Sequence, residues 1–240
     1  MKNVLVTGAN KGIGFEVAKQ MAELGYFVYL GCRNEQNGLE AVNNLRKLNI
    51  LNVELLQIDV SDLNSVKEAA SKLAPEIDAL DILINNAGVA GSQPQNISAC
   101  DISLLKDVFN TNYFGAIQTT QAMLPLLEKA KHPVIVNVSS ELGSLAMQTS
   151  EGRVPNWDNY HAYGSTKTAL NTFTILLAHE FRNTKFRINS VTPGYTATDL
   201  NGFAGLKTAA QGAQHIVRMA TIGADGPSGK FFREGGEVPW

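Results

Sequence analysis

The sequence predicts an α/β fold, a doubly wound parallel sheet of about seven strands with helices on both faces. Short β-rich runs alternate with longer helical patterns along all 240 residues, which is typical of βαβ units joined by right-handed crossovers. The runs Val4–Val6, Ile82–Ile84 and Val134–Val136 are apolar throughout, as in strands buried on both faces. No repeat or linker interrupts the pattern, so we expect a single domain over residues 1–240.

The expected elements follow from this alternation. Strands are expected at Asn3–Thr7, Phe27–Gly31, Val53–Gln57, Asp81–Asn85, Pro133–Ser139, Phe186–Val191 and Lys230–Phe232. Helices are expected at Gly14–Leu24, Glu35–Leu48, Leu63–Leu73, Ile102–Lys131, Tyr160–Phe181 and Thr208–Met219. The polar stretch Ala146–Asn159, which contains Pro155 and Trp157, falls between a strand and a helix, where α/β proteins place ligand-binding loops.

Composition and charge narrow the class of protein. An apolar content of 44% with 18% charged residues is ordinary for a globular chain, and a net charge of −2 argues against nucleic acid or an anionic membrane as partner. The sequence contains no membrane-length apolar run and no secretory signal, so we expect a cytoplasmic protein. Cys32, Cys100 and the four histidines lack the spacing of a redox or metal site, so we expect reduced thiols and no metal.

A glycine-rich turn follows the first strand and opens the first helix. Within it, backbone N–H groups can approach a pyrophosphate, and the helix N-terminus adds partial positive charge. The spacing is Gly-x3-Gly-x-Gly, so tight packing alone is the alternative, but the position at the first βα junction favours a dinucleotide site in a Rossmann sheet. The candidate cofactor-binding residues of this turn are Gly8, Asn10, Lys11, Gly12, Ile13 and Gly14.

The end of the second strand indicates which dinucleotide binds. NAD sites usually place a carboxylate there for the ribose 2′-hydroxyl, whereas this chain has Arg33 and no acid. Arg33 can hold a 2′-phosphate through two charge-assisted hydrogen bonds, and Lys11 can add a second positive charge. The alternative is a pair of solvated surface cations. We expect NADP(H) in preference to NAD(H).

Tyr163 and Lys167 are the candidate acid–base pair. Residues four apart share one helix face, so the phenol and the ammonium group are expected to point into the same space. A neighbouring cation favours the phenolate and lowers a tyrosine pKa from its usual value near ~10. Tyr160 lacks such a partner, because the residue four positions later is Gly164. Ser140 ends a buried strand at the ligand-binding edge, where it can donate to a carbonyl or simply cap a turn.

These motifs, taken together and in this order, resemble the short-chain dehydrogenase/reductase family over essentially the whole chain. The resemblance rests on the glycine turn, Asp59-Val60, Asn85-Asn86-Ala87-Gly88, Asn112, Ser140, the Tyr163/Lys167 pair and Pro193-Gly194. It implies that Ser140 polarises a carbonyl, that Tyr163 is the general acid in reduction, and that Lys167 lowers the tyrosine pKa and holds the nicotinamide ribose. It also implies that Asn112 anchors a proton-relay water; mid-helix solvent exposure is the alternative for Asn112.

The resemblance further implies which residues line the cofactor. Asp59 would meet the adenine, with a helix cap as the alternative role, and Thr198 would lie near the carboxamide. The full set implied beyond the glycine turn and Arg33 is Asp59, Val60, Asn86, Ala87, Gly88, Tyr163, Lys167, Pro193, Gly194, Thr196 and Thr198.

Within that family the chain is similar to the NADPH-dependent carbonyl reductases, in the turn Val6–Gly14 and the tail Gly226–Trp240. Ser140 and Tyr163 are 23 positions apart, which implies a short insertion, and the stretch Asp199–Lys207 implies a short substrate lid and an open pocket. We expect a monomer, with a dimer or tetramer as the alternative. The candidate substrate contacts, any of which could instead be loop packing, are Glu141, Leu142, Met147, Trp157, Tyr195 and Phe203.

The sequence therefore predicts an NADPH-dependent carbonyl reductase acting on ketones or aldehydes. One alternative is an NADH-dependent alcohol dehydrogenase of the same family, and another is a non-catalytic dinucleotide sensor. A sensor is expected to have lost part of Asn112, Ser140, Tyr163 and Lys167, all of which are present. A sugar-nucleotide epimerase or dehydratase would need a larger C-terminal domain than 240 residues provide.

Overall fold

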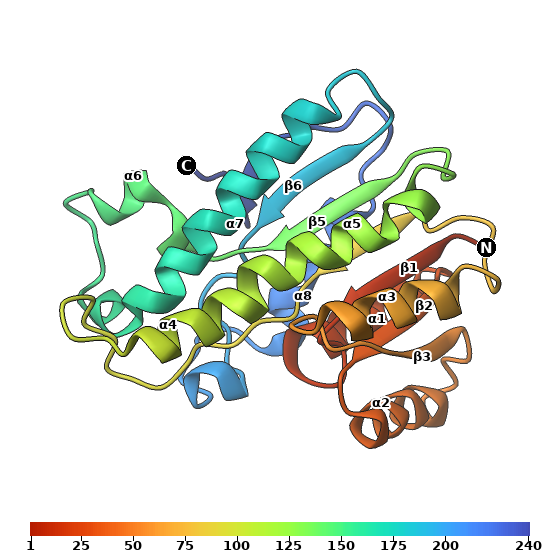
Figure 1. Cartoon of the computed structure of the whole chain (residues 1–240), viewed down its shortest axis with the longest axis horizontal. Helices are drawn as coiled ribbons and strands as arrows, with labels where there is room; N and C mark the ends of the chain where they lie inside the picture. Colours follow the sequence, from red (N-terminus) through yellow and green to blue (C-terminus); the bar gives the residue numbers. More distant parts are fainter.

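The computed structural model describes residues 1–240, apart from the side chain of Pro155. One sheet runs through the molecule in the order β3-β2-β1-β4-β5-β6-β7-β8, with β1 to β7 parallel (Figure 1). Its strands are β1 Asn3–Thr7, β2 Phe27–Cys32, β3 Val53–Gln57, β4 Ile82–Asn85, β5 Val134–Val138, β6 Arg187–Val191, β7 Lys230–Arg233 and β8 Gly236–Glu237. The predicted α/β class and all seven expected strands are confirmed.

Helices cover both faces of the sheet (Figure 1). The main helices are α1 Gly12–Glu23, α2 Glu35–Lys47, α3 Leu63–Leu73, α4 Ile102–Phe109, α5 Gly115–Leu127, α7 His161–Glu180 and α8 Ala209–Ala220. Successive strand side chains point to opposite faces, so Val4 and Val6 pack with α1, α2 and α8, while Leu5 packs with α3, α5 and α7. Two apolar cores therefore hold the sheet between helical layers.

The predicted helix Ile102–Lys131 is divided in the structure. A five-residue π-helical segment, Asn110–Phe114, separates α4 from α5, and α5 ends at Leu127. Hydrophobic periodicity is read over windows of about 11 residues or more, so it does not locate a segment as short as this one. The segment rotates Asn112 into the interior, where 1% of its surface is exposed.

Two further elements depart from the expectation. β8 pairs antiparallel with β7 through Phe232–Glu237 and Arg233–Gly236, and its two exposed residues carry no apolar alternation that could predict a strand. The polar stretch Ala146–Asn159, called the insertion below, includes most of one helical turn, α6 Leu145–Gln148. It also includes most of a 3-10 segment, Pro155–Tyr160, which leads directly into α7. Arg153 ties its two halves together by donating to Gln148 Oε1 (2.9 Å) and Asp158 Oδ1 (2.6 Å).

The topology determines where a ligand can bind. The chain progresses in one direction through β1, β2 and β3, then returns to place β4 on the other side of β1. The loops after β1 and β4 therefore leave in opposite directions and open a crevice at the carboxyl edge of the sheet. None of the described helices has both the length and the hydropathy needed for a membrane span.

Candidate active site

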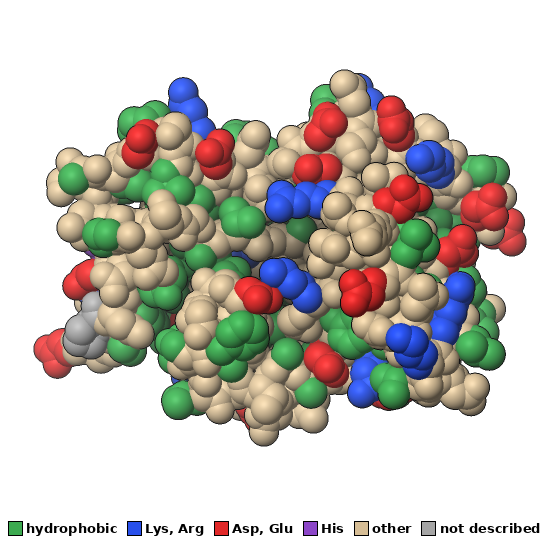
Figure 2. All heavy atoms as spheres, turned by 90° about the horizontal axis from the view of Figure 1, so that it is seen from below, with side chains coloured by type: hydrophobic (Ala, Val, Ile, Leu, Met, Phe, Trp, Pro, Cys, Tyr) green, Lys and Arg blue, Asp and Glu red, His purple; other side chains and the backbone are tan. Residues whose placement is uncertain are grey.

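A cavity of about 820 Å³ occupies the carboxyl edge of the sheet. Its walls run from the glycine turn, past the ends of β2 and β4, to Tyr163 and on to the insertion and the segment after β6. The face seen in Figure 2 is hollowed near its middle, with basic side chains beside the hollow. The structure thus joins the predicted nucleotide and catalytic ends in one continuous space.

The glycine turn leaves the N-terminus of α1 open to this cavity. Gly8 and Gly12 have φ values of +65° and +57°, a left-handed conformation that glycine adopts at little cost. A Cβ on Gly8 would lie 2.9 Å from Ala87 Cα, and one on Gly14 would collide with Gly8 O and the Asn86 amide. Lys11 is the N-cap of α1 and makes no side-chain cap hydrogen bond. Free helix N–H groups next to a side-chain-free cradle fit a pyrophosphate.

Asn86 holds this turn against β4. Its Nδ2 donates to the carbonyl oxygens of Thr7 (2.9 Å) and Gly8 (3.2 Å), and the Thr7 hydroxyl accepts from the backbone N–H of Asn86 at 3.0 Å. The side chain of Asn86 is therefore engaged in shaping the turn, while Asn86, Ala87 and Gly88 all form part of the cavity wall. This dual position fits the cofactor-lining role that the sequence predicts.

The adenosine end of the predicted site carries both acid and base. Arg33 is exposed at the end of β2 and lines the cavity, as do Asp59 and Val60 after β3. Asp59 Oδ1 accepts from the Ser61 backbone N–H (2.9 Å) and hydroxyl (2.6 Å), an arrangement that orders this corner. Lys11, the second predicted phosphate ligand, lies 3.1 Å from Asp199 Oδ2 in an exposed ion pair.

Tyr163 and Lys167 meet on α7, as the sequence predicts. Lys167 Nζ lies 5.5 Å from the centroid of the Tyr163 ring and donates to Val138 O at 2.8 Å. Lys167 is 3% exposed and is held at the end of β5 by this bond. Tyr160 stacks edge-on against Tyr163, with ring centroids 6.4 Å apart, and has no comparable cation.

Desolvation is the largest cause of the pKa shifts of both Tyr163 and Lys167. It raises the pKa of Tyr163 well above the usual value, against the lowering effect of a Ser140 hydrogen bond and with a smaller rise from Tyr160. Burial also lowers the pKa of Lys167 to about 8. The pKa of Tyr163 thus shifts in the direction opposite to the lowering that the sequence predicts, and desolvation is the largest cause of the shift. Tyr163 is a protonated phenol at neutral pH.

Two serines follow β5 at this point. Ser140 is half-buried, and its Oγ accepts from the Leu142 backbone N–H at 3.3 Å, so the predicted turn-capping role is present. The Ser140 hydroxyl lines the cavity next to Tyr163, whose pKa a Ser140 hydrogen bond lowers. Ser139 is 2% exposed, lines the cavity, and has no hydrogen-bond partner for its Oγ among the described atoms. An orphaned buried hydroxyl in the wall fits a polar ligand here.

Asn112 lies behind the wall. Its Nδ2 donates to Val89 O (2.9 Å) and Thr166 Oγ1 (3.0 Å), while its Oδ1 accepts from the Val89 N–H at 2.8 Å. The alternative of a solvent-facing residue is excluded by its 1% exposure. Both hydrogens of its Nδ2 are engaged, so the side chain links the loop at Val89 to Thr166 of α7.

The far half of the cavity is mainly apolar and aromatic. Among the predicted substrate contacts, Glu141, Leu142, Trp157 and Tyr195 line it, whereas Met147 and Phe203 do not form part of its wall. Phe203 is 66% exposed. Glu141 is paired with Arg233 at 3.2 Å. Wall residues that the sequence did not single out as substrate contacts include Val154, Tyr160, Leu200 and Leu206.

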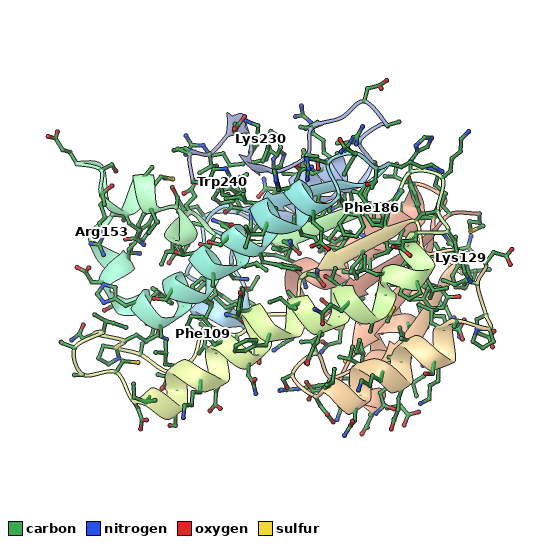
Figure 3. The ribbon with its side chains drawn as sticks, turned by 45° about the horizontal axis from the view of Figure 1, so that its top comes forward. Phe109, Lys129, Arg153, Phe186, Lys230 and Trp240 are labelled. Atoms are coloured by element: carbon green, nitrogen blue, oxygen red, sulfur yellow. The ribbon has the colours of Figure 1, made fainter. Side chains whose placement is uncertain are left out.

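The C-terminal residues Pro239 and Trp240 hold the insertion in place close to Ser140. Ser144 Oγ donates to Pro239 O at 2.6 Å, and the Ala146 N–H donates to Trp240 O at 2.9 Å. The Trp240 ring stacks on Phe231 of β7 with centroids 5.7 Å apart. Figure 3 shows Trp240 near the insertion, whose outer part carries Arg153. The loop after Ser140 is therefore fixed from the opposite end of the chain.

The fold and site together define a dinucleotide-binding α/β protein with a tyrosine–lysine pair in the wall of its cavity. Residues 2–208 match the short chain dehydrogenase family, so the chain belongs to the short-chain dehydrogenase/reductase family of oxidoreductases. The salutaridine reductase of Papaver bracteatum is 33% identical, with 97% of this chain and 94% of that protein aligned. The (-)-isopiperitenone reductase of Mentha piperita is 35% identical, with 95% of each aligned.

Solved structures agree with this assignment. Salutaridine reductase from Papaver somniferum superposes with a TM-score of 0.86 at 32% identity, covering 97% of this chain and 99% of that one. An NADPH-bound carbonyl reductase from chicken fatty liver also gives 0.86, at 26% identity, covering 100% and 99%. The two sequence alignments above span 294 and 299 positions against 240 residues here, so those relatives carry internal residues that this chain lacks.

Proposed function

We propose that this protein is an NADPH-dependent carbonyl reductase that converts ketones or aldehydes to alcohols. The observation that carries the proposal is the phenol of Tyr163 beside Lys167, both in the wall of a cavity that is continuous with the glycine turn. A carbonyl oxygen that receives hydride at carbon needs a proton, and the protonated phenol of Tyr163 in the cavity wall can supply it. The predicted general acid is thus in the protonation state that reduction requires.

Four side chains of this protein are assigned roles in the proposed reaction. Ser140, at the cavity wall, is positioned to donate a hydrogen bond to the carbonyl oxygen, and Tyr163 donates the proton. Lys167 places positive charge near the phenol, which favours the phenolate left after proton transfer. When bound, the nicotinamide dinucleotide supplies the hydride. Asn112 holds the Val89 backbone and Thr166 of α7 in fixed relation behind these groups.

NADP(H) is favoured over NAD(H) by the charge at the end of β2. Arg33 is exposed, lines the cavity, and makes no hydrogen bond or ion pair to another described residue, so its guanidinium can turn to a 2′-phosphate. The NADPH-bound carbonyl reductase from chicken fatty liver is in keeping with this assignment. An NADH-dependent alcohol dehydrogenase remains the second candidate.

The substrate is inferred to be a small neutral carbonyl compound. The far half of the cavity is lined mainly by Leu142, Val154, Trp157, Tyr160 and Leu206, side chains that favour apolar ligands. The relatives named salutaridine reductase and (-)-isopiperitenone reductase are in keeping with a small-molecule substrate. We also propose a cytoplasmic protein that works as a monomer.

Turnover of a panel of ketones and aldehydes, followed as oxidation of NADPH and separately of NADH, tests the proposal. We expect reduction of several members with NADPH preferred. Tyr163→Phe removes the donated proton but keeps the ring, so we expect nearly unchanged NADPH binding and a turnover at least ~100-fold lower. Turnover by Tyr163→Phe at the wild-type rate contradicts the mechanism, and nucleotide binding without any turnover favours a sensor.

A further inference from the structure

Gln95 is a fully buried polar residue to which no role has been given. It lies in the loop between β4 and α4, and none of its surface is exposed. It is not part of the cavity wall, although Ala90 and Gly91 of the same loop are. A buried amide needs hydrogen-bond partners, since leaving one unsatisfied costs about 1–3 kcal/mol. The partners of Gln95 therefore indicate why it is there.

Both ends of the Gln95 amide are engaged. Its Nε2 donates to Ala90 O at 2.6 Å and to Ser92 O at 3.1 Å, which fixes the loop after β4. Its Oε1 accepts from the backbone N–H of Tyr163 at 3.0 Å, across 68 residues of sequence. One side chain thus joins a cavity-wall loop to the backbone of the candidate general acid.

The start of α7 explains why this acceptor is needed. The N-cap of α7 is Tyr160, which makes no side-chain cap hydrogen bond. The first N–H groups of a helix have no acceptor within the helix, and the third is usually satisfied by a Ser, Thr, Asp or Asn at the N-cap. In α7 the third residue is Tyr163, and Gln95 supplies the missing acceptor from a distant loop.

We propose that Gln95 is a positioning residue that holds Tyr163 at a fixed place relative to the loop after β4. The catalytic consequence rests on the proposed function, whereas the contact itself does not. The phenol oxygen is carried by the residue whose backbone Gln95 holds, so fraying of this helix turn displaces the proton donor directly. A displacement of about 1 Å in a catalytic group can cost about 100-fold in rate.

The test compares Gln95→Met with Asn189→Leu. Methionine has a similar length to glutamine but neither donates nor accepts comparably, so the hold on Tyr163 is lost. Asn189 is an equally buried amide that joins Pro227 O (2.8 Å) and the Lys230 N–H (3.1 Å), outside the cavity wall. Both variants lose stability, but we expect only Gln95→Met to lose kcat, by about 10- to 100-fold, with NADPH Kd within about twofold.

Gln95→Glu provides the rescue. Its carboxyl group keeps an acceptor for the Tyr163 N–H and, when protonated, donates to one of the two loop carbonyls. We expect it to recover a substantial part of the kcat lost in Gln95→Met. A residue that only fills space would show no difference in kcat between these two variants, and this result would overturn the proposal.

Amide hydrogen exchange gives a readout that does not depend on turnover. We expect exchange at the Tyr163 N–H, measured in the nucleotide-free protein, to quicken in Gln95→Met and to stay unchanged in Asn189→Leu. Unchanged exchange, or a kcat loss no larger than in Asn189→Leu, overturns the inference. If the wild type reduces no carbonyl compound, the proposed function fails, and the exchange measurement still decides whether Gln95 holds Tyr163.

Discussion

Lys167 is an ionisable residue whose side chain is almost completely buried. Only 3% of the residue is exposed, and burial lowers its pKa to about 8. Its one hydrogen-bond acceptor among the described residues is the neutral carbonyl of Val138, which cannot offset the loss of hydration by charge. At neutral pH this residue is expected to oppose folding, since the chain must bury a cation. Its retention in the site is therefore best explained by its place beside Tyr163.

The pH dependence of stability tests this reasoning. The pKa of Lys167 in the folded protein lies below the usual lysine value of 10.5, so between about pH 8 and 10.5 the unfolded chain binds more protons. The contribution of Lys167 to the free energy of unfolding is thus least favourable below pH 8 and rises with pH, by up to ~3 kcal/mol. Lys167→Met lacks this rise. Urea unfolding at pH 7 and pH 10 should show wild type gaining on Lys167→Met; a pH-independent difference contradicts the lowered pKa.

Arg33 carries the choice of cofactor at a single exposed position. Arg33→Asp replaces a cation with a carboxylate, which repels a 2′-phosphate and accepts from a ribose 2′-hydroxyl. We expect kcat/KM for NADPH to fall below that for NADH. The comparison of kcat/KM for the two nucleotides in wild type and variant measures the change. If NADPH is still preferred by Arg33→Asp, the cofactor is selected elsewhere in the cavity.

At the scale of elements, an ion pair connects two loops at the mouth of the cavity. Lys11 belongs to the glycine turn, and Asp199 begins the short 3-10 segment Asp199–Asn201 after β6. Both side chains are more than half exposed, so the pair contributes little to stability. The pair affects the binding of an anion more than it affects stability, because Asp199 and the anion compete for the ammonium group of Lys11.

Asp199→Asn should release Lys11 for the nucleotide. We expect the NADPH Kd to fall by about two- to fivefold at low salt, the range open to an exposed charge, and the gain to shrink at high salt. Asp225→Asn removes the same charge outside the cavity wall and serves as the control. Fluorescence titration of both variants measures the effect, and equal Kd values for the two would show that the pair does not influence binding.

How far the sequence predicts an element depends on whether its cause is local. β1 and β4 are predicted because burial on both faces demands unbroken apolar runs, and the residues of the glycine turn because their conformations have few alternatives. The π-helical segment around Asn112 and the hold of Gln95 on Tyr163 depend on contacts between distant parts of the chain. Nothing in the neighbourhood of Gln95 distinguishes it from an ordinary loop glutamine.

For the molecule as a whole, the order of motifs predicted the architecture correctly. Most of the motifs follow a strand, and parallel strands bring their carboxyl ends to one edge of the sheet, so these motifs lie close together in space. The energetics could not be predicted in the same way. The raised pKa of Tyr163 follows from desolvation of the phenol in the folded chain, and the spacing of residues in the sequence does not predict it.

The seating of the insertion by the C-terminal segment has a consequence for how the sequence can vary. The acceptors at Pro239 and Trp240 and the donor at Ala146 are main-chain atoms, and only Ser144 contributes a side chain. Main-chain groups are present whatever residue occupies the position, apart from proline as a donor. Other residues can therefore replace Ala146 and Pro239 without loss of the hydrogen bonds that hold the loop after Ser140. Substitution of Ser144 or of Trp240, whose ring stacks on Phe231, would instead remove a side-chain contact that holds the loop.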